Sequence, residues 1–423
     1  MTSALRVANA LDTSNSSSYR ASWVLAFSVP QLVGWGSLYY AFALLIAQIG
    51  VELHLTQLEL ASAFSLGLLV EGIMAYPVGR MIDQGKARWL MPFGSFMACL
   101  GLWLLSRVHQ LLDLYLAWII LGSAMSMVLY NASFAVVTHR FPTHFRQAII
   151  TLSLLGGLAS TVFIPLVAWM VNKLGWRHAV EILALLQLLL CVPLHIALLR
   201  NSATPTIRQS VGVKSTNAEL RRLLCSWPFL LVCAFIILMT TVSAALPLHL
   251  VSMLRAFGLE ETWAILVPAS MGIFQVASRL LLYFFEKRFD VHVANRIIPM
   301  LIPLGVMMLL MASIIASQSA LVFAFGFILL FGMGNGMLTI VKGTAMAQYV
   351  SREHVASLNG AMGLPLALAR ASAPLLLATL WSHQFGYVLG LSVLLIVAIL
   401  GVMALKLAQR LSRAVDSHDT LVS

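Results

Sequence analysis

Two charged residues interrupt long apolar segments of the sequence and are the first candidates for chemistry. Glu71 lies near the middle of the apolar run 57–79, and Arg370 lies near the middle of the run 356–380. An ionisable side chain at the centre of a membrane helix costs about 2.5 to 3.5 kcal/mol on insertion scales, so its presence points to a function. A carboxyl group can carry a proton and a guanidinium can bind an anion. The two residues together therefore suggest proton-coupled handling of an anion.

Polar side chains recur at helical spacing in other apolar runs. Trp35 and Tyr39 follow Gln31 at intervals of four residues, which places the three on one helix face. Such a stripe can line a cavity, but polar residues also hold membrane helices together, so packing is the alternative for each of them. The candidate substrate contacts are Arg370, Gln31, Trp35, Tyr39, Tyr130, Asn131, Asn335 and Lys342.

Two further basic residues lie inside apolar runs. Lys342 shares a face with Asn335 and Thr339, which favours a cavity wall, although the long side chain can also reach toward the headgroup region. For Arg279, near the cytoplasmic end of its run, that second interpretation is the preferred one. Packing is also the expected role of Thr240 and Gln275.

The composition excludes a water-soluble protein. Of the 423 residues 60% are hydrophobic and 10% are charged, and the mean hydropathy is +0.93. Soluble domains carry roughly 25% charged residues. A membrane-spanning helix needs about 20 apolar residues, and the sequence contains twelve such runs, at residues 22–49, 57–79, 90–107, 112–137, 147–171, 178–199, 226–254, 262–285, 297–316, 320–345, 356–380 and 385–408.

The basic residues indicate orientation and division into halves. Nineteen of the 26 Lys and Arg residues fall in connections on one side of the membrane and four on the other, so the positive-inside rule places both termini in the cytoplasm. The remaining three are Arg279, Lys342 and Arg370. The predicted organisation is a cytoplasmic tail, a six-helix bundle, a cytoplasmic central loop, a second six-helix bundle and a cytoplasmic tail, at 1–21, 22–199, 200–225, 226–408 and 409–423.

Several function classes find no support. The net charge of +11 is spread over short loops, with no basic stripe for nucleic acid. Neither a disulfide framework nor a metal site is indicated, because the cysteines lie in or beside apolar runs without ligand spacing: Cys99, Cys191, Cys225 and Cys233. We expect no cofactor and no enzymatic activity, since the sequence has no phosphate-binding GxxxxGK[ST] loop, HExxH zinc motif or GxSxG elbow.

The connection between the second and third runs carries a family motif. It contains Gly79, Asp83, Gly85, Lys86 and Arg88, and it resembles the signature loop of the major facilitator superfamily: glycine, three residues, aspartate, a basic residue, any residue, glycine, then basic residues. The sequence departs from that pattern in having Gln84 in place of the basic residue and one residue fewer before the glycine. The resemblance covers essentially the whole chain.

This resemblance implies an all-α integral membrane fold with twelve transmembrane helices in two pseudo-symmetric six-helix bundles. It implies that helices 1, 4, 7 and 10 line a central cavity and that helices 2 and 11 meet between the halves. Asp83 would then contact the start of helix 11 and close the cytoplasmic side in the outward-facing state. Glu71 and Arg370 would form or break an ion pair between the halves, and Glu71 would accept a proton when a substrate anion engages Arg370. A permanent structural pair is the alternative.

The resemblance implies a secondary transporter that works by alternating access, driven by protons or by an exchanged solute. Buried cations outnumber buried acids, which favours an organic anion such as a carboxylate. The run Gly34-Trp35-Gly36 in helix 1, together with basic residues in helices 8 and 11, loosely resembles the monocarboxylate and oxalate/formate branch. The alternatives are a proton-driven drug or metabolite exporter and a non-transporting sensor or scaffold. We expect a monomer in the cytoplasmic (inner) membrane whose partners are the lipid bilayer and a small molecule, without nucleic acid.

Overall fold

The computed structural model describes residues 21–200, 217–285, 291–315, 320–382 and 384–422. Within these ranges the chain is helical, and the one β-bridge joins Ser382 to Gly386. Eleven helices are long and apolar enough to cross a membrane, and a bent pair, α17 (Val355–Ala361) and α18 (Gly363–Thr379), supplies a twelfth span. The predicted tail 1–21 and most of the central loop 200–225 lie outside the described residues.

The first six spans form one bundle. In chain order they are α2 (Ala21–Gly34), η1 (Trp35–Tyr40) and α3 (Ala41–Leu53); α4 (Gln57–Asp83); α5 (Ala87–Ser106); α6 (Leu111–Val128) and α7 (Tyr130–Arg140); α8 (Phe145–Gly157) and α9 (Ala159–Leu174); and α10 (Trp176–Leu186), η2 (Gln187–Cys191) and α11 (Val192–Leu199).

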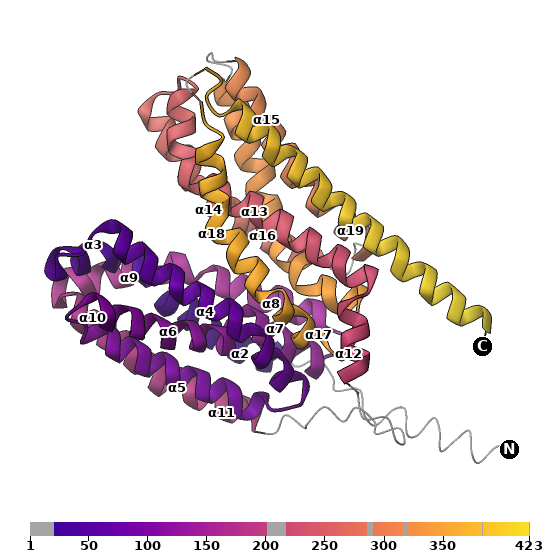
Figure 1. Ribbon diagram of the computed structural model, residues 1–423, viewed down its shortest axis with the longest axis horizontal. Helices are drawn as coiled ribbons and strands as arrows, with labels where there is room; N and C mark the ends of the chain where they lie inside the picture. The colour runs from indigo at the N-terminus through magenta and orange to yellow at the C-terminus, as the bar shows by residue number, and fades with distance from the viewer. Residues whose placement is uncertain (1–20, 201–216, 286–290, 316–319, 383, 423) are drawn as a thin grey trace.

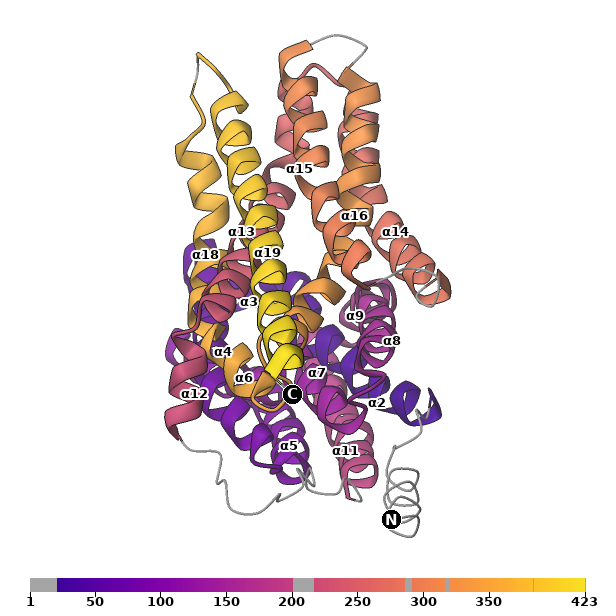
Figure 2. The ribbon, with the colours of Figure 1, turned by 90° about the vertical axis from the view of Figure 1, so that its right-hand side faces the viewer.

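The short helix α12 (Asn217–Leu224) precedes the second bundle, which consists of α13 (Trp227–Ala256), α14 (Glu261–Phe285), α15 (Val291–Ile315), α16 (Ala320–Tyr349), the pair α17 and α18, and α19 (Val388–Val422). The helix α19 continues through the predicted tail that begins at residue 409. In Figure 2 the start of α2 and the end of α19 lie at the same end of the molecule as α12. We refer to this end as the predicted cytoplasmic side.

Several spans deviate from a regular α-helix where they approach the other half. The fourth span is broken at Leu129, which has an extended backbone. The eleventh bends by 41° at Met362, three residues before Pro365, whose missing N–H interrupts the helical hydrogen bonds. The first span contains the π-helix η1. Irregular backbone at membrane depth is tolerated where it is buried in protein or lines a cavity, so these deviations mark the place to look for a site.

The two bundles converge on one side and separate on the other. Figure 1 shows them meeting near α7, α8 and α17, while their opposite ends, marked by α3 and α15, lie apart. Packing between the bundles is concentrated in α4 against α17 and α18, with additional contacts of α8 with α14 and α16. The halves are therefore joined on the predicted cytoplasmic side.

Polar contacts tie together the opposite end of the first bundle. The Glu52 carboxylate, in the last turn of α3 and beyond the membrane-crossing part Ala21–Ile46, accepts hydrogen bonds from the Trp176 indole and from Arg177 Nε. Arg177 also donates to the carbonyl oxygens of Ser106 and Val108 at the end of the third span. The Trp176 and Arg177 hydrogen bonds lower the pKa of the Glu52 carboxyl. This contact fixes the ends of three spans relative to one another.

Candidate functional site

A cavity of about 330 Å³ lies between the two bundles. Its volume is near the lower end of the range for small-molecule sites, roughly 300 to 1,000 Å³. From the first bundle it is lined by Trp35, Tyr40, Glu71, Tyr130, Asn131 and Phe134. From the second bundle its polar lining consists of Thr240, Gln275, Arg279, Thr339, Lys342, Asn359 and Arg370.

Glu71 and Arg370 face each other across the cavity from α4 and α18. Arg370 Nη1 lies 3.9 Å from Glu71 Oε2, and both residues line the cavity. This distance allows electrostatic attraction but is too long for a hydrogen bond. Glu71 Oε2 and Arg370 Nε are buried without a hydrogen-bond partner among the described residues. The pair is therefore loose, and each side chain retains hydrogen-bonding capacity.

Two further cations complete one side of the cavity. Lys342 Nζ lies 3.3 Å from the hydroxyl of Thr240. Arg279 is 7% exposed, and its Nε donates to the carbonyl oxygen of Gly336 at 3.1 Å. The preferred expectation that Arg279 extends toward the headgroups is thus wrong. Its guanidinium reaches the first bundle, where a Cβ on Gly157 would overlap Nη1. We call Arg279, Lys342 and Arg370 the cation side.

Aromatic side chains from the first bundle form the facing surface. The Trp35 and Tyr130 ring centroids are 4.9 Å apart, and the Tyr130 ring stacks on Phe134 at 4.9 Å. The Tyr40 ring lies 6.4 Å from Trp35. We call Trp35, Tyr40, Tyr130 and Phe134 the aromatic wall.

The π-helix changes which tyrosine reaches the cavity. An α-helix would place Tyr39 on the same face as Trp35, and Tyr39 was predicted there. A π-helix closes its hydrogen bonds over five residues, so Tyr40 shares the face of Trp35 and lines the cavity. Tyr39 is not among the lining residues, and its ring instead packs against Trp35 and Phe64.

The break in the fourth span positions Tyr130 and Asn131 at the cavity and gives Gln31 a structural role. Gln31 is fully buried, and its Nε2 donates to the Val128 carbonyl oxygen and to Ser133 Oγ. The Val128 carbonyl directly precedes the break. Gln31 does not line the cavity, contrary to its predicted role as a substrate contact.

Replacing Gln31 by leucine is expected to lower stability without changing substrate affinity. The buried Val128 carbonyl would lose its strongest donor, and such a loss costs about 1–3 kcal/mol. Gln187→Leu is the matched control, because the Gln187 amide donates to a serine hydroxyl rather than to a broken helix. Thermal unfolding in detergent should show a larger loss for Gln31→Leu. Weaker ligand binding by Gln31→Leu at unchanged stability would instead indicate that Gln31 contacts the substrate.

Asn335 also lies outside the cavity lining. On α16 the lining residues are Thr339, Lys342 and Gly343, and the Asn335 carbonyl accepts a hydrogen bond from the Thr339 hydroxyl one turn further along. Of the predicted face, Thr339 and Lys342 therefore line the cavity and Asn335 does not. Thr240 and Gln275, expected in packing, line the cavity instead.

A seam of small residues closes the space between the cavity and the predicted cytoplasmic side. It consists of Gly72, Ala75 and Gly79 on α4 and Ala356, Gly360 and Gly363 on α17 and α18. A Cβ added at Gly79 would overlap the Ala356 carbonyl oxygen, and one added at Gly360 would overlap that of Ala75. Small residues allow such close approach of membrane helices. The seam depends on the absence of side chains.

Asp83 lies at the end of this seam that faces the predicted cytoplasmic side. Its carboxylate accepts hydrogen bonds from the backbone N–H groups of Ala356 (3.1 Å) and Ser357 (2.7 Å), at the first turn of α17. A helix N-terminus carries unpaired N–H groups and attracts negative charge. His139 Nε2 lies 2.9 Å from the same carboxylate. The sequence thus places the signature aspartate against helix 11, and the structure adds a histidine partner from α7.

The other motif residues have different positions. Gly85 adopts a φ of +79° in the turn between α4 and α5, a conformation that favours glycine. Lys86 and Arg88 are exposed, and the Arg88 guanidinium lies 5.5 Å from the centre of the Trp89 ring. A second contact between the halves comes from Arg352, whose Nη1 donates to the Pro142 carbonyl oxygen at 3.4 Å. Within the motif, Gly79 and Asp83 make the contacts with the second bundle.

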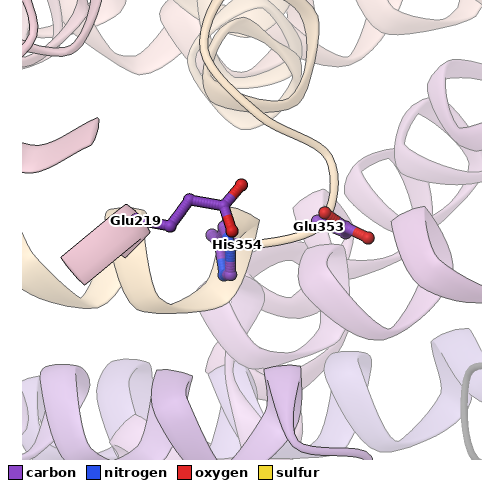
Figure 3. Close-up of side chains that lie close together, drawn as sticks. All are labelled: Glu219, Glu353 and His354. Carbon is purple, nitrogen blue, oxygen red and sulfur yellow. The ribbon is translucent and has the colours of Figure 1, made fainter. Parts of the chain in front are cut away.

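A separate group of ionisable side chains lies outside the cavity. Figure 3 shows Glu219 of α12 near Glu353 and His354, which precede α17. One ligand atom from each lies within 4.8 Å of the others. Glu219 and Glu353 are exposed, so water can solvate both carboxylates and their proximity requires no bound ion.

The sequence did not identify several residues of the cavity and the seam, among them Tyr40, Arg279 and His139. Tyr40 was missed because no sequence pattern predicts a π-helix. Arg279 was missed because its position near the end of an apolar run fits a side chain that reaches the headgroups. His139 precedes Arg140 at the end of the fourth span, and nothing in the sequence indicates that its side chain contacts Asp83 of the signature loop. Each omission concerns a side chain whose direction depends on tertiary packing.

Comparison with known proteins agrees with this architecture. Rat (Rattus norvegicus) monocarboxylate transporter 13 is 25% identical over 315 residues, which cover 71% of each protein. A bacterial homologue of the iron transporter ferroportin, in an outward-facing state, has a similar structure, with a TM-score of 0.71 and 14% identity over 93% of this chain and 99% of that one. The E. coli fucose:proton symporter superposes with a TM-score of 0.68 at 11% identity, over 92% and 99% of the chains.

The twelve spans and the signature loop find their counterpart in a sequence family. The profile of the Major Facilitator Superfamily matches residues 31–374, most of the chain. Members of this superfamily are membrane transporters of small molecules and not enzymes. The chain therefore belongs to the Major Facilitator Superfamily.

Proposed function

We propose that this protein is a secondary active transporter that moves a small organic anion, such as a carboxylate, by alternating access. The main observation behind the proposal is the excess of positive charge in the cavity. The lining contains the three basic residues of the cation side and a single carboxylate, that of Glu71. Charges in a cavity with low-dielectric walls concentrate ions of opposite sign. An anion would gain charge-assisted hydrogen bonds there, whereas a cation would be repelled. The similarity to a monocarboxylate transporter supports the same class of substrate.

The proposed transport cycle uses the seam as its cytoplasmic gate. With Asp83 bound to α17 and the glycines of α4 packed against it, the described arrangement corresponds to an outward-facing state. Opening would separate α4 from α17, and the cavity would then face the cytoplasm. The orientation follows from the distribution of Lys and Arg, and we propose a monomer in the inner membrane with both termini in the cytoplasm.

We assign proton coupling to Glu71, and Glu71→Gln is expected to abolish the pH dependence of anion flux. Glu71 faces Arg370 in the cavity. An anion that binds Arg370 would screen the cation that faces Glu71, which links anion binding to the charge of the carboxylate. Glutamine cannot exchange a proton. Initial rates from pH 5.5 to 8 should be flat for Glu71→Gln and should fall with rising external pH for the wild type; an unchanged profile in the variant would contradict the assignment.

The experiment that tests the proposed function is flux into proteoliposomes that contain a pH-sensitive dye. An imposed proton gradient is combined in turn with small carboxylates and with lipophilic cationic drugs. Saturable carboxylate uptake with accompanying proton movement supports the proposal. Drug-dependent proton movement without carboxylate uptake overturns it in favour of an exporter, and the absence of any flux for either class favours a non-transporting role.

A further inference from the structure

We propose that the transported anion is an aromatic carboxylate, with its ring on the aromatic wall and its carboxylate on the cation side. This inference rests on the proposed function and specifies the substrate of the same cavity. Every cation in the lining comes from the second bundle, and all four residues of the aromatic wall come from the first. The cavity therefore presents an apolar surface and a charged surface on opposite sides, which matches a molecule with one apolar and one anionic end.

The aromatic wall is a continuous surface that faces the cavity. Its rings lie in sequence, with centroid separations of 6.4 Å between Tyr40 and Trp35, 4.9 Å between Trp35 and Tyr130, and 4.9 Å between Tyr130 and Phe134. The first three rings are only partly buried. Aromatic rings bind one another in offset or edge-to-face arrangements that contribute beyond simple burial of area. A ring in the substrate would extend this row, whereas a two-carbon acid would leave it exposed.

Unpartnered polar atoms belong to residues on both sides of the cavity. Among the buried side-chain N and O atoms that lack a hydrogen-bond partner in the described parts of the chain, three belong to cavity residues: Trp35 Nε1, Glu71 Oε2 and Arg370 Nε. Buried polar groups are normally paired, so such atoms call for a ligand or water. Arg370 Nε is a donor for a carboxylate, and Trp35 Nε1 is a donor on the opposite wall. Unused hydrogen-bonding capacity therefore exists on both sides of the cavity.

A ligand that touches both sides would also connect the two bundles. Alternating access requires the substrate to bind both halves as they rock around it, and a conformational change needs a ligand that distinguishes the two states. A short aliphatic acid can satisfy the cation side alone. An aryl carboxylate gives each bundle a contact, so we expect the ring to affect transport rate as well as affinity.

The test compares uptake of benzoate and phenylacetate with that of acetate, lactate and cyclohexanecarboxylate in wild-type proteoliposomes. We expect an uptake efficiency about tenfold higher for the aryl acids than for acetate and lactate, equivalent to about 1.4 kcal/mol, with cyclohexanecarboxylate between them. Trp35→Leu should lower uptake of the aryl acids more than uptake of acetate and so remove most of this preference, whereas Trp35→Phe should retain it. Trp169→Leu is the matched control, because Trp169 is 58% exposed on the outer surface of α9.

The outcomes separate this inference from the proposed function. Uptake of acetate or lactate at least as efficient as that of the aryl acids overturns the inference and leaves the anion transporter standing. An equal loss for all acids in Trp35→Leu also overturns it, because the ring would then have no selective role. If no carboxylate is taken up, the proposed function itself fails.

Discussion

Arg370→Gln is expected to reduce carboxylate uptake about tenfold to a hundredfold while leaving the yield of folded protein close to that of the wild type. Hydrogen bonds to charged groups contribute about 1.5–3 kcal/mol, and each 1.4 kcal/mol is a factor of ten in affinity. The Arg370 side chain retains 24% exposure at the cavity and is 3.9 Å from Glu71, so little stability depends on their attraction. The measurement is initial uptake against carboxylate concentration, normalised to monodisperse protein.

The control and the double variant separate binding from packing. Arg88→Gln removes an exposed arginine of the signature loop that contacts the Trp89 ring, and it should leave uptake near wild type. If Glu71 and Arg370 were only a structural pair, Glu71→Gln combined with Arg370→Gln would restore both stability and uptake, because neither buried charge would remain unpaired. Recovery of uptake in the double variant would contradict a role for Arg370 in binding the anion.

The second large effect is expected at the seam. Gly79→Ala and Gly360→Ala should each shift the protein away from the state that is closed on the predicted cytoplasmic side. The added Cβ would meet a backbone carbonyl oxygen of the facing helix, and backbone cannot move aside as a flexible side chain can. Overpacking of this kind costs about 1–3 kcal/mol, a shift of about five- to 150-fold in the equilibrium.

Accessibility of the cavity measures this shift. A cysteine introduced by Thr339→Cys, in a chain whose four native cysteines are replaced, would be labelled by a membrane-impermeant thiol reagent from each side in turn. Labelling from the cytoplasmic side should increase in Gly79→Ala and Gly360→Ala. Gly326→Ala is the matched control, because its nearest contact would be the flexible Met308 side chain at 3.4 Å. Equal labelling of all variants would show that the seam does not control access.

Much of this architecture could be predicted from the sequence because it depends on patterns that lipid enforces. A helix must be apolar over its full membrane depth, so the twelve runs predicted spans that agree with the structure to within a few residues at most ends. The approach of Asp83 to helix 11 was implied instead by the resemblance to the signature loop of the superfamily, and a helix N-terminus attracts an acidic side chain. Glu71 and Arg370 were recognisable because isolated charges in apolar runs are rare.

The direction of individual side chains was less predictable because it depends on tertiary detail. The i→i+5 hydrogen bonds of the π-helix η1 bring Tyr40 rather than Tyr39 to the cavity. The break at Leu129 exposes a carbonyl that Gln31 satisfies, and no spacing rule reveals a broken helix whose sequence remains apolar. Arg279 faces the interior because Gly157 leaves space for its guanidinium. Such features arise where two helices meet, and a single helix pattern does not contain them.

Calorimetric titration of the purified protein shows whether the cation side binds an anion between the two bundles. Phenylacetate is titrated into wild-type protein, Arg370→Gln and Lys342→Gln, with a lipophilic cation as the comparison ligand. We expect one saturable anion site in the wild type, affinity at least tenfold weaker in either variant, and no binding of the cation. Saturable binding of the cation with none of the anion would show that the cation side does not bind an anion.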